Sequence, residues 1–249
     1  MAPARKIIAL DFDGTLLETS YESFLTAART YKEFTGKDLE NPVNAKRYAR
    51  GRGFSLNAES NYTLTKIIDE NPEIDFVNFT QEEFDIKKAQ NKGIGEEYAK
   101  RFGENRKKFA ETKEWFEIQK PFEGIKEMIS EWSSNYQVYI TTTKKLWSVL
   151  ALLKHHGINF AEEKIISDHA KETKEHLLLR VAELEKVPIS QVILIDDALK
   201  QAIFAKQAGA KAILAMWGEK RKSFEEGAKK EEILIAYNPD DCLKIVKSL

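Results

Sequence analysis

The sequence predicts an α/β protein: a parallel sheet with helices on both faces, and a block of helices inserted between its first and second strands. In the C-terminal half, short apolar runs alternate with amphipathic helical patterns, such as those over residues 146–156 and 175–186. This alternation is typical of a parallel sheet, whose strands are buried on both faces. The apolar runs that we expect to form strands are residues 7–10, 138–140, 164–166, 192–195, 212–215 and 233–236.

The stretch from residue 19 to residue 119 shows helical periodicity and no convincing strand pattern. Its helical patterns cover residues 21–35, 81–92 and 97–116. A helical block of this length between two strands is best interpreted as an inserted domain. We therefore expect one domain to comprise residues 1–18 and 120–249, and the other to comprise residues 19–119.

Composition and charge exclude several classes of protein. The 249 residues include 39 Lys and Arg against 40 Asp and Glu, so the net charge is close to zero. A protein that binds nucleic acid or an anionic membrane usually has an excess of basic residues, which this composition does not show. No apolar run approaches the ~20 residues of a membrane span, and the N-terminus shows no apolar signal-peptide region. The single cysteine, Cys242, favours buried packing in a reducing compartment. We expect a cytoplasmic protein without nucleic-acid or membrane partners.

Two carboxylates, Asp11 and Asp13, follow the first apolar run at alternate positions, and Gly14 comes directly behind them. Because side chains alternate along an extended chain, both carboxylates point to the same side and crowd one small site. Such crowding is costly unless a cation lies between the acids or one of them is protonated. The first outcome is a metal site, and the second places a nucleophile beside a general acid. A plain polar turn is the alternative.

Three hydroxyl residues, Thr141, Thr142 and Thr143, continue from the second expected strand. Ligands of open parallel sheets bind at the carboxyl ends of the strands, where hydroxyls and free backbone N–H groups suit a phosphate. Threonine is also common in ordinary strands, so this pattern alone does not decide between the two interpretations.

Further charged residues occur at two later positions. Lys174 opens a helical pattern, with Lys171 three residues earlier, and a lysine there either stabilises a phosphoryl group or lies solvated on the surface. Asp196 and Asp197 directly follow the apolar run at 192–195, where two unpaired buried acids would be expensive. They are better explained as a metal ligand and its support. In a signalling receiver domain, the acid pair comes at the first strand and the phosphorylated Asp follows later. Here the candidate nucleophile Asp11 comes first and the adjacent pair Asp196-Asp197 comes last, so the order of the groups argues against a receiver domain.

Together these motifs resemble the haloacid dehalogenase (HAD) superfamily, and within it the phosphoglycolate-phosphatase-like branch with a helical cap. The resemblance implies a Rossmann-like catalytic core from residues 1–18 and 120–249, and an all-α cap from residues 19–119. The segments that carry it are Asp11–Thr19, Pro121–Gly124, Asn135–Lys144, the helical pattern from Lys174, and Asp196-Asp197 with the residues up to Gly218. The family often has a further Asp four residues after position 197; this chain has Gln201 there, and we expect the pair Asp196-Asp197 to serve instead.

The resemblance implies a Mg²⁺-dependent phosphatase that forms an aspartyl-phosphate. Asp11 would attack phosphorus. Asp13 would protonate the leaving alkoxide and later take a proton from the attacking water. Asp11, the backbone carbonyl of Asp13, and Asp197 or Asp196 would bind the metal. A dehalogenase needs no acid for its leaving group, so Asp13 argues for phosphoryl transfer.

The phosphoryl oxygens would be held by Thr142 and Lys174. Thr141 and Lys171 are the alternatives in the neighbouring register. In the cap, Arg52 stands between two glycines and would take a carboxylate or a second phosphate, unless it is solvated on a surface loop. The candidate substrate-binding residues are Gly14, Arg52, Thr141, Thr143 and Lys171.

The expected substrate is a small phosphorylated metabolite of the phosphoglycolate or sugar-phosphate type. A phosphomutase or phosphotransferase of the same fold is the alternative enzyme, and a non-catalytic phosphate-recognition module is the alternative outside enzymes. We expect such a chain to work as a monomer, because its cap comes from its own sequence.

Overall fold

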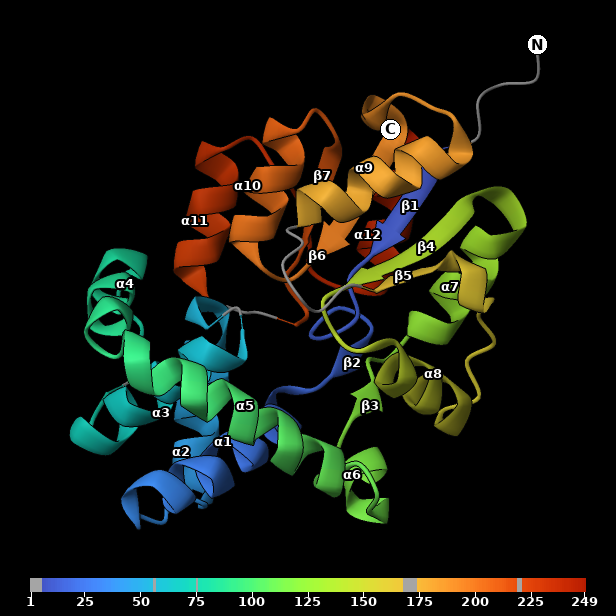
Figure 1. Ribbon diagram of the computed structural model, residues 1–249. Coiled ribbons are helices and arrows are strands. Elements are labelled where there is room, and N and C mark those ends of the chain that lie inside the picture. Colours follow the sequence, from blue (N-terminus) through green and yellow to red (C-terminus); the bar gives the residue numbers. More distant parts are fainter. Residues whose placement is uncertain (1–5, 56, 75, 168–173, 219–220) are drawn as a thin grey trace. The chain divides into compact units, whose positions relative to one another are not determined.

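The computed structural model describes residues 6–55, 57–74, 76–167, 174–218 and 221–249. The chain divides into two compact units, Met1–Glu18 with Lys120–Leu249, and Thr19–Gln119 (Figure 1). We call the first the sheet unit and the second the helical unit.

The sheet unit is built on a six-stranded sheet in the order β5-β4-β1-β6-β7-β8. All neighbouring pairs are parallel, as the sequence predicts. The strands are β1 (Ile7–Leu10), β4 (Gln137–Thr142), β5 (Ile165–Ser167), β6 (Val192–Asp196), β7 (Lys211–Ala215) and β8 (Leu234–Ala236). The first strand of the chain therefore lies in the middle, between β4 and β6. The strand order reverses there, which is where open α/β sheets bind their ligands.

Helices flank this sheet on both faces (Figure 1). Its helices are α7 (Ile125–Asn135), α8 (Leu146–His155), α9 (Lys174–Glu185), α10 (Leu199–Gln207), α11 (Lys222–Lys230) and α12 (Pro239–Ser248), with the short 3-10 turns η2 (Glu162–Lys164) and η3 (Ile189–Gln191). Helix α10 contacts both α9 and α11, and α7 contacts α12. Leu177 and Val181 of α9 are fully buried in a core that includes Ile7 and Leu194 of the sheet. The predicted α/β class is confirmed.

The chain leaves the sheet unit through β2 (Leu17–Glu18) and returns through β3 (Lys120–Pro121), and these two strands pair antiparallel. The Phe122 N–H extends the pairing by donating to the Leu16 carbonyl at 3.1 Å. Strands of two residues are too short to show an alternating pattern, so this ribbon is not visible in the sequence. It fixes the far end of the loop that begins at Asp11.

The helical unit contains helices and no strand among its described residues. They are α1 (Ser20–Thr35), α2 (Pro42–Gly51), η1 (Arg52–Phe54), α3 (Ala58–Glu70), α4 (Gln81–Gln90), α5 (Lys92–Phe109) and α6 (Lys113–Glu117). The helical pattern over 97–116 proves to be two helices. Thr112 begins α6, because its hydroxyl accepts a hydrogen bond from the Trp115 N–H at 3.3 Å. No helix in the described ranges is long and apolar enough to cross a membrane.

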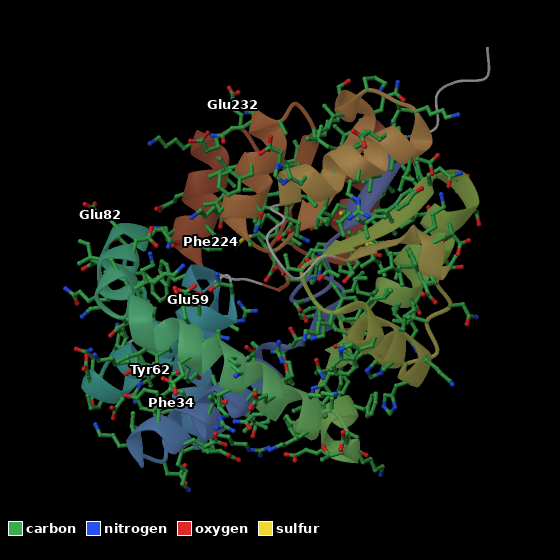
Figure 2. The ribbon with its side chains drawn as sticks, in the orientation of Figure 1. Phe34, Glu59, Tyr62, Glu82, Phe224 and Glu232 are labelled. Carbon is green, nitrogen blue, oxygen red and sulfur yellow. The ribbon has the colours of Figure 1, made fainter. Side chains whose placement is uncertain are left out.

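Aromatic rings and an ion pair to a buried glutamate hold the helical unit together, and Figure 2 labels two of these rings, those of Phe34 and Tyr62. Phe34 of α1 and Tyr62 of α3 contact the ring of Tyr98 in α5, with centroids 5.6 and 5.4 Å apart. Glu22 of α1 is fully buried and accepts two hydrogen bonds from the Arg106 guanidinium of α5, at 2.9 and 2.7 Å. These contacts give the helical unit a core of its own.

Candidate active site

The register of the sheet brings distant carboxylates together. Leu10 of β1 pairs with Ile195 of β6, and the Asp11 N–H donates to the Ile195 carbonyl at 2.9 Å. Asp11 therefore lies at the carboxyl end of the central strand, next to Asp196 at the end of β6. Two acids separated by most of the chain meet at the edge of the sheet where ligands bind.

A hydrogen-bonded loop follows β1. The Leu17 N–H donates to the Phe12 carbonyl at 3.1 Å, and the Gly14 N–H donates to the Leu17 carbonyl at 2.8 Å. Gly14 has a φ of 85°, in the left-handed region that favours glycine. A Cβ at Gly14 would also overlap the carboxylate of Asp197, whose Cγ lies 2.5 Å from the ideal Cβ position. The glycine thus allows the loop to lie directly against Asp197.

Lys174, the first residue of α9, is almost completely buried among these acids. Its ammonium donates to Asp11 Oδ1 at 2.5 Å and to the backbone carbonyl of Thr141. Asp196 Oδ2 lies 3.5 Å from the same nitrogen. Burying an ammonium is costly unless carboxylates pair with it, so this lysine and the two acids belong to one site. The other candidate lysine, Lys171, lies outside the described residues.

Three carboxylates of this site could hold a metal ion. Asp11, Asp196 and Asp197 each offer one oxygen, and these oxygens lie within 4.8 Å of one another. Asp196 Oδ1 accepts a hydrogen bond from the Ala198 N–H at 2.8 Å, whereas its buried Oδ2 has the 3.5 Å ion-pair contact with Lys174 Nζ and no hydrogen bond within the described ranges. The Asp197 N–H donates to Thr15 Oγ1 at 3.1 Å, which fixes the backbone of that acid. Buried carboxylate oxygens with unused acceptor capacity fit a hard divalent cation.

The electrostatics of the site show an excess of negative charge. Burial raises the pKa of Asp11 to about 7; the Lys174 ammonium opposes this rise, and Asp196 and Asp13 add to it. Burial also raises the pKa of Asp196. Burial acts to lower the pKa of Lys174, but the two facing carboxylates outweigh it and the pKa is raised, so the lysine stays charged. The Lys174 ammonium does not compensate the charges of Asp11, Asp196 and Asp197, and a bound cation would.

A second buried lysine, Lys144, pairs with Asp13. The Nζ–Oδ1 distance is 3.0 Å, and the side chains of Lys144 and Asp13 are 3% and 24% exposed. The Lys144 N–H donates to Thr142 Oγ1 at 3.0 Å, and its carbonyl accepts from Ser167 Oγ at 2.6 Å. We did not identify Lys144 from the sequence, where it is one lysine among many. Its position two residues after Thr142, at the end of a predicted strand, is the signal that could have found it.

The other predicted binding residues have different environments. Thr141 and Thr142 end β4 and are buried, and Thr141 Oγ1 has no hydrogen-bond partner in the part of the chain that is described. Thr143 is exposed. Arg52 belongs to the helical unit, where it lies in η1 and donates to the Ser55 carbonyl. The roles of these four residues in substrate binding stay predictions.

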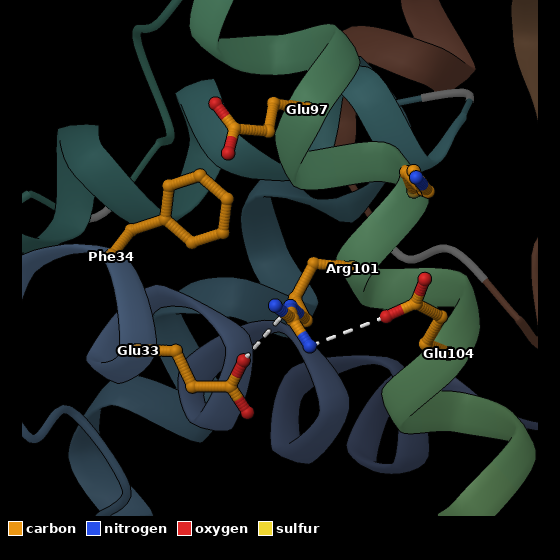
Figure 3. A pocket seen from close by; sticks show the side chains of 6 residues that line it. Glu33, Phe34, Glu97, Arg101 and Glu104 are labelled. Carbon is orange, nitrogen blue, oxygen red and sulfur yellow. Dashed lines mark ion pairs between the residues drawn. The ribbon is translucent and has the colours of Figure 1, made fainter.

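The helical unit has a cavity of about 300 Å³ beside α1 and α5 (Figure 3). Its lining residues are Glu33, Phe34, Glu97, Lys100, Arg101 and Glu104. Arg101 pairs with Glu33 at 3.4 Å and with Glu104 at 3.3 Å. Arg101 is thus paired with two of the acids that line the cavity, and the lining mixes acidic, basic and aromatic side chains without selecting one class of ligand. The candidate active site is therefore the group of carboxylates and lysines in the sheet unit.

The fold and the site define an α/β protein whose acids and lysines gather at the carboxyl end of its central strand. The family model of haloacid dehalogenase-like hydrolases matches residues 5–209, and the chain belongs to this family. The resemblance drawn from the sequence motifs is therefore confirmed. A search of curated proteins finds no match.

Solved structures with a similar fold include several from bacteria. A predicted phosphatase from Clostridium acetobutylicum has a TM-score of 0.68 and 17% identity, over 99% of this chain and 100% of that one. A predicted phosphoglycolate phosphatase from Haemophilus somnus has a TM-score of 0.65 and 15% identity, over 99% and 100%. A haloacid dehalogenase-like family hydrolase from Streptococcus pneumoniae has a TM-score of 0.65 and 17% identity, over 98% and 99%. At these identities the likeness shows the fold.

Proposed function

We propose that this protein is a Mg²⁺-dependent phosphatase acting on a small phosphorylated metabolite of the phosphoglycolate or sugar-phosphate type, through an aspartyl-phosphate. The observation that carries the proposal is the contact between Lys174 Nζ and Asp11 Oδ1 at the carboxyl end of the central strand. A lysine there holds the nucleophile and would also face the oxygens of a phosphoryl group. The family and the phosphatases of similar fold support the same reaction class.

The proposed reaction has two steps, each with a defined proton movement. In the first, a carboxylate oxygen of Asp11 attacks phosphorus, the ester P–O bond breaks, and Asp13 gives its proton to the leaving alkoxide. In the second, water attacks the same phosphorus while Asp13 takes a proton from that water. The bond between phosphorus and the Asp11 oxygen breaks, which releases the Asp11 carboxylate and inorganic phosphate. Lys174 and Thr142 hold the phosphoryl oxygens during both steps.

The metal in this proposal is Mg²⁺, held by Asp11, the backbone carbonyl of Asp13, and Asp196 or Asp197. Bound there, it would offset negative charge, so that an anionic nucleophile can approach an anionic ester. Asp196 and Asp197 both lie in the acid cluster, which fits a direct ligand and a supporting acid.

The helical unit is proposed to act as a cap that selects the substrate, as lids do in other enzymes. We propose a small-molecule substrate, no nucleic-acid or membrane partner, a monomer, and a cytoplasmic location. Arg52 of η1 is the proposed contact for a carboxylate or second phosphate of the substrate.

The test uses p-nitrophenyl phosphate with the purified full chain. Wild type should release p-nitrophenol with Mg²⁺ and lose this activity in EDTA. Asp11→Asn should abolish it, while Asp240→Asn, which changes an exposed acid of α12, should keep it. Activity that survives EDTA or Asp11→Asn contradicts the mechanism, and the absence of any phosphate release contradicts the function. A phosphomutase would instead convert a sugar phosphate into its isomer without releasing phosphate.

A further inference from the structure

We propose that Lys144 is a positioning residue for Asp13: its buried ammonium holds the carboxylate in the one orientation that serves the leaving group. The inference rests on the proposed function, in which Asp13 is the general acid and base. It assigns a role to a residue that the motifs leave unassigned.

The first argument is that Lys144 is itself held in place. Its backbone N–H bonds to Thr142 Oγ1 at the end of β4, and its carbonyl accepts from Ser167 at the end of β5. Its ammonium also lies 6.0 Å from the centre of the buried Phe12 ring. A lysine normally keeps many rotamers, but a buried one anchored at two strand ends presents its charge at a fixed point.

The second argument is that Asp13 needs such a partner. Asp13 lies in the loop after β1 and its side chain is 24% exposed, whereas Asp11 is nearly buried at the strand end. An aspartate with access to water would adopt several rotamers, and only some of them reach the leaving oxygen. An ion pair at 3.0 Å to a fixed ammonium selects among these rotamers.

The third argument is that the two buried lysines contact different carboxylates. Lys174 contacts Asp11 and faces Asp196, while Lys144 contacts Asp13. Each proposed catalytic carboxylate therefore has its own buried ammonium, from a different element of the sheet unit. Substitution at Lys144 should therefore affect the proton transfers of Asp13 and leave the contacts of Asp11 unchanged.

The experiment compares phenyl phosphate with p-nitrophenyl phosphate, two esters of similar shape that differ in how much their leaving oxygen needs a proton. Lys144→Met should lower kcat/KM for phenyl phosphate roughly tenfold more than for p-nitrophenyl phosphate, because general-acid catalysis matters most for the poorer leaving group. Lys144→Arg, which keeps the charge, should fall between wild type and Lys144→Met. Lys145→Met, which changes the neighbouring exposed lysine, should leave both values unchanged.

A double-mutant cycle then shows whether Lys144 acts through Asp13. Asp13→Asn should show the same preference for the better leaving group, and adding Lys144→Met to it should cause no further loss. Equal losses on both esters, or losses that multiply in the double variant, overturn the inference. If circular dichroism shows that Lys144→Met does not fold, Lys144→Arg and the double variant of Lys144→Arg with Asp13→Asn are judged by the same criteria. A wild type that hydrolyses neither ester overturns the proposed function and this inference together, whereas an active wild type with uniform losses overturns this inference alone.

Discussion

Replacing Gly14 with alanine should damage the site in two separable ways. A residue with a Cβ at a φ of 85° costs about 1–2 kcal/mol in backbone strain. The new Cβ would also lie 2.1 Å from Asp197 Oδ2 and 2.5 Å from its Cγ, whereas real Cβ contacts do not fall below 3.0 Å. Asp197 Oδ2 must therefore move by about 0.9 Å or more, the difference between 2.1 and 3.0 Å, which displaces this carboxylate from the acid cluster.

The helical unit offers a matched control for this prediction. Gly36, at the end of α1, has a φ of 75°, but nothing lies within 4 Å of its Cβ position. Both Gly14→Ala and Gly36→Ala should lower the melting temperature by about 2–8 °C, from the strain alone. Only Gly14→Ala should weaken Mg²⁺ binding in a calorimetric titration, roughly 10- to 100-fold. The reasoning is refuted if Gly14→Ala binds Mg²⁺ like wild type, or if Gly36→Ala loses affinity to the same extent.

Two further predictions concern stability. Arg106→Met removes the guanidinium that donates two hydrogen bonds to the buried carboxylate of Glu22, which keeps the hydrogen bond from the Thr26 hydroxyl. Because the Arg106 side chain is 26% exposed, we expect a loss at the low end of the usual range, about 3 kcal/mol, measured as a lower urea midpoint. An unchanged midpoint contradicts this. Burial raises the pKa of Asp11 from 3.8 to about 7, so the folded metal-free protein keeps a proton that the unfolded chain has released. Stability in EDTA should therefore fall as the pH rises from about 4 to about 7, and Asp11→Asn should flatten this trend. If Asp11→Asn shows the same fall of stability with pH, groups other than Asp11 cause it and this prediction is wrong.

Much of the sheet unit could be predicted because its strands are continuous apolar runs bounded by polar residues. Asp11 and Asp196 follow two such runs, and parallel pairing then brings them to the same edge. The sequence pattern also indicated Lys174, since it opens the helix that follows β5. These predictions depend only on where strands end, which buried runs indicate well.

The helical unit was harder to predict because capping residues resemble helix breakers. Asn41 and Pro42 are residue types that often interrupt a helical pattern, yet Asn41 accepts a hydrogen bond from the Asn44 N–H and begins α2. Asn57 begins α3 in the same way, with Ser60 completing a capping box. An Asn or an Asn-Pro pair is compatible with both a turn and a helix start, so periodicity alone does not separate them.

Lys144 shows a different limit of sequence reasoning. Its partner Asp13 is 131 residues away in the chain, and no local pattern reports a contact over that distance. Lysine is frequent in this sequence and is usually solvated. Only the pairing of β1 with β4 brings this lysine to the loop after β1.

The most direct test of the central claim is to trap the phosphorylated enzyme during turnover. Borohydride reduces an aspartyl-phosphate to homoserine, which mass spectrometry locates in the sequence. The account predicts homoserine at position 11, dependent on both substrate and Mg²⁺, and unmodified Asp13. Homoserine at position 13, or phosphate release at full rate with no reduced residue at all, would contradict it.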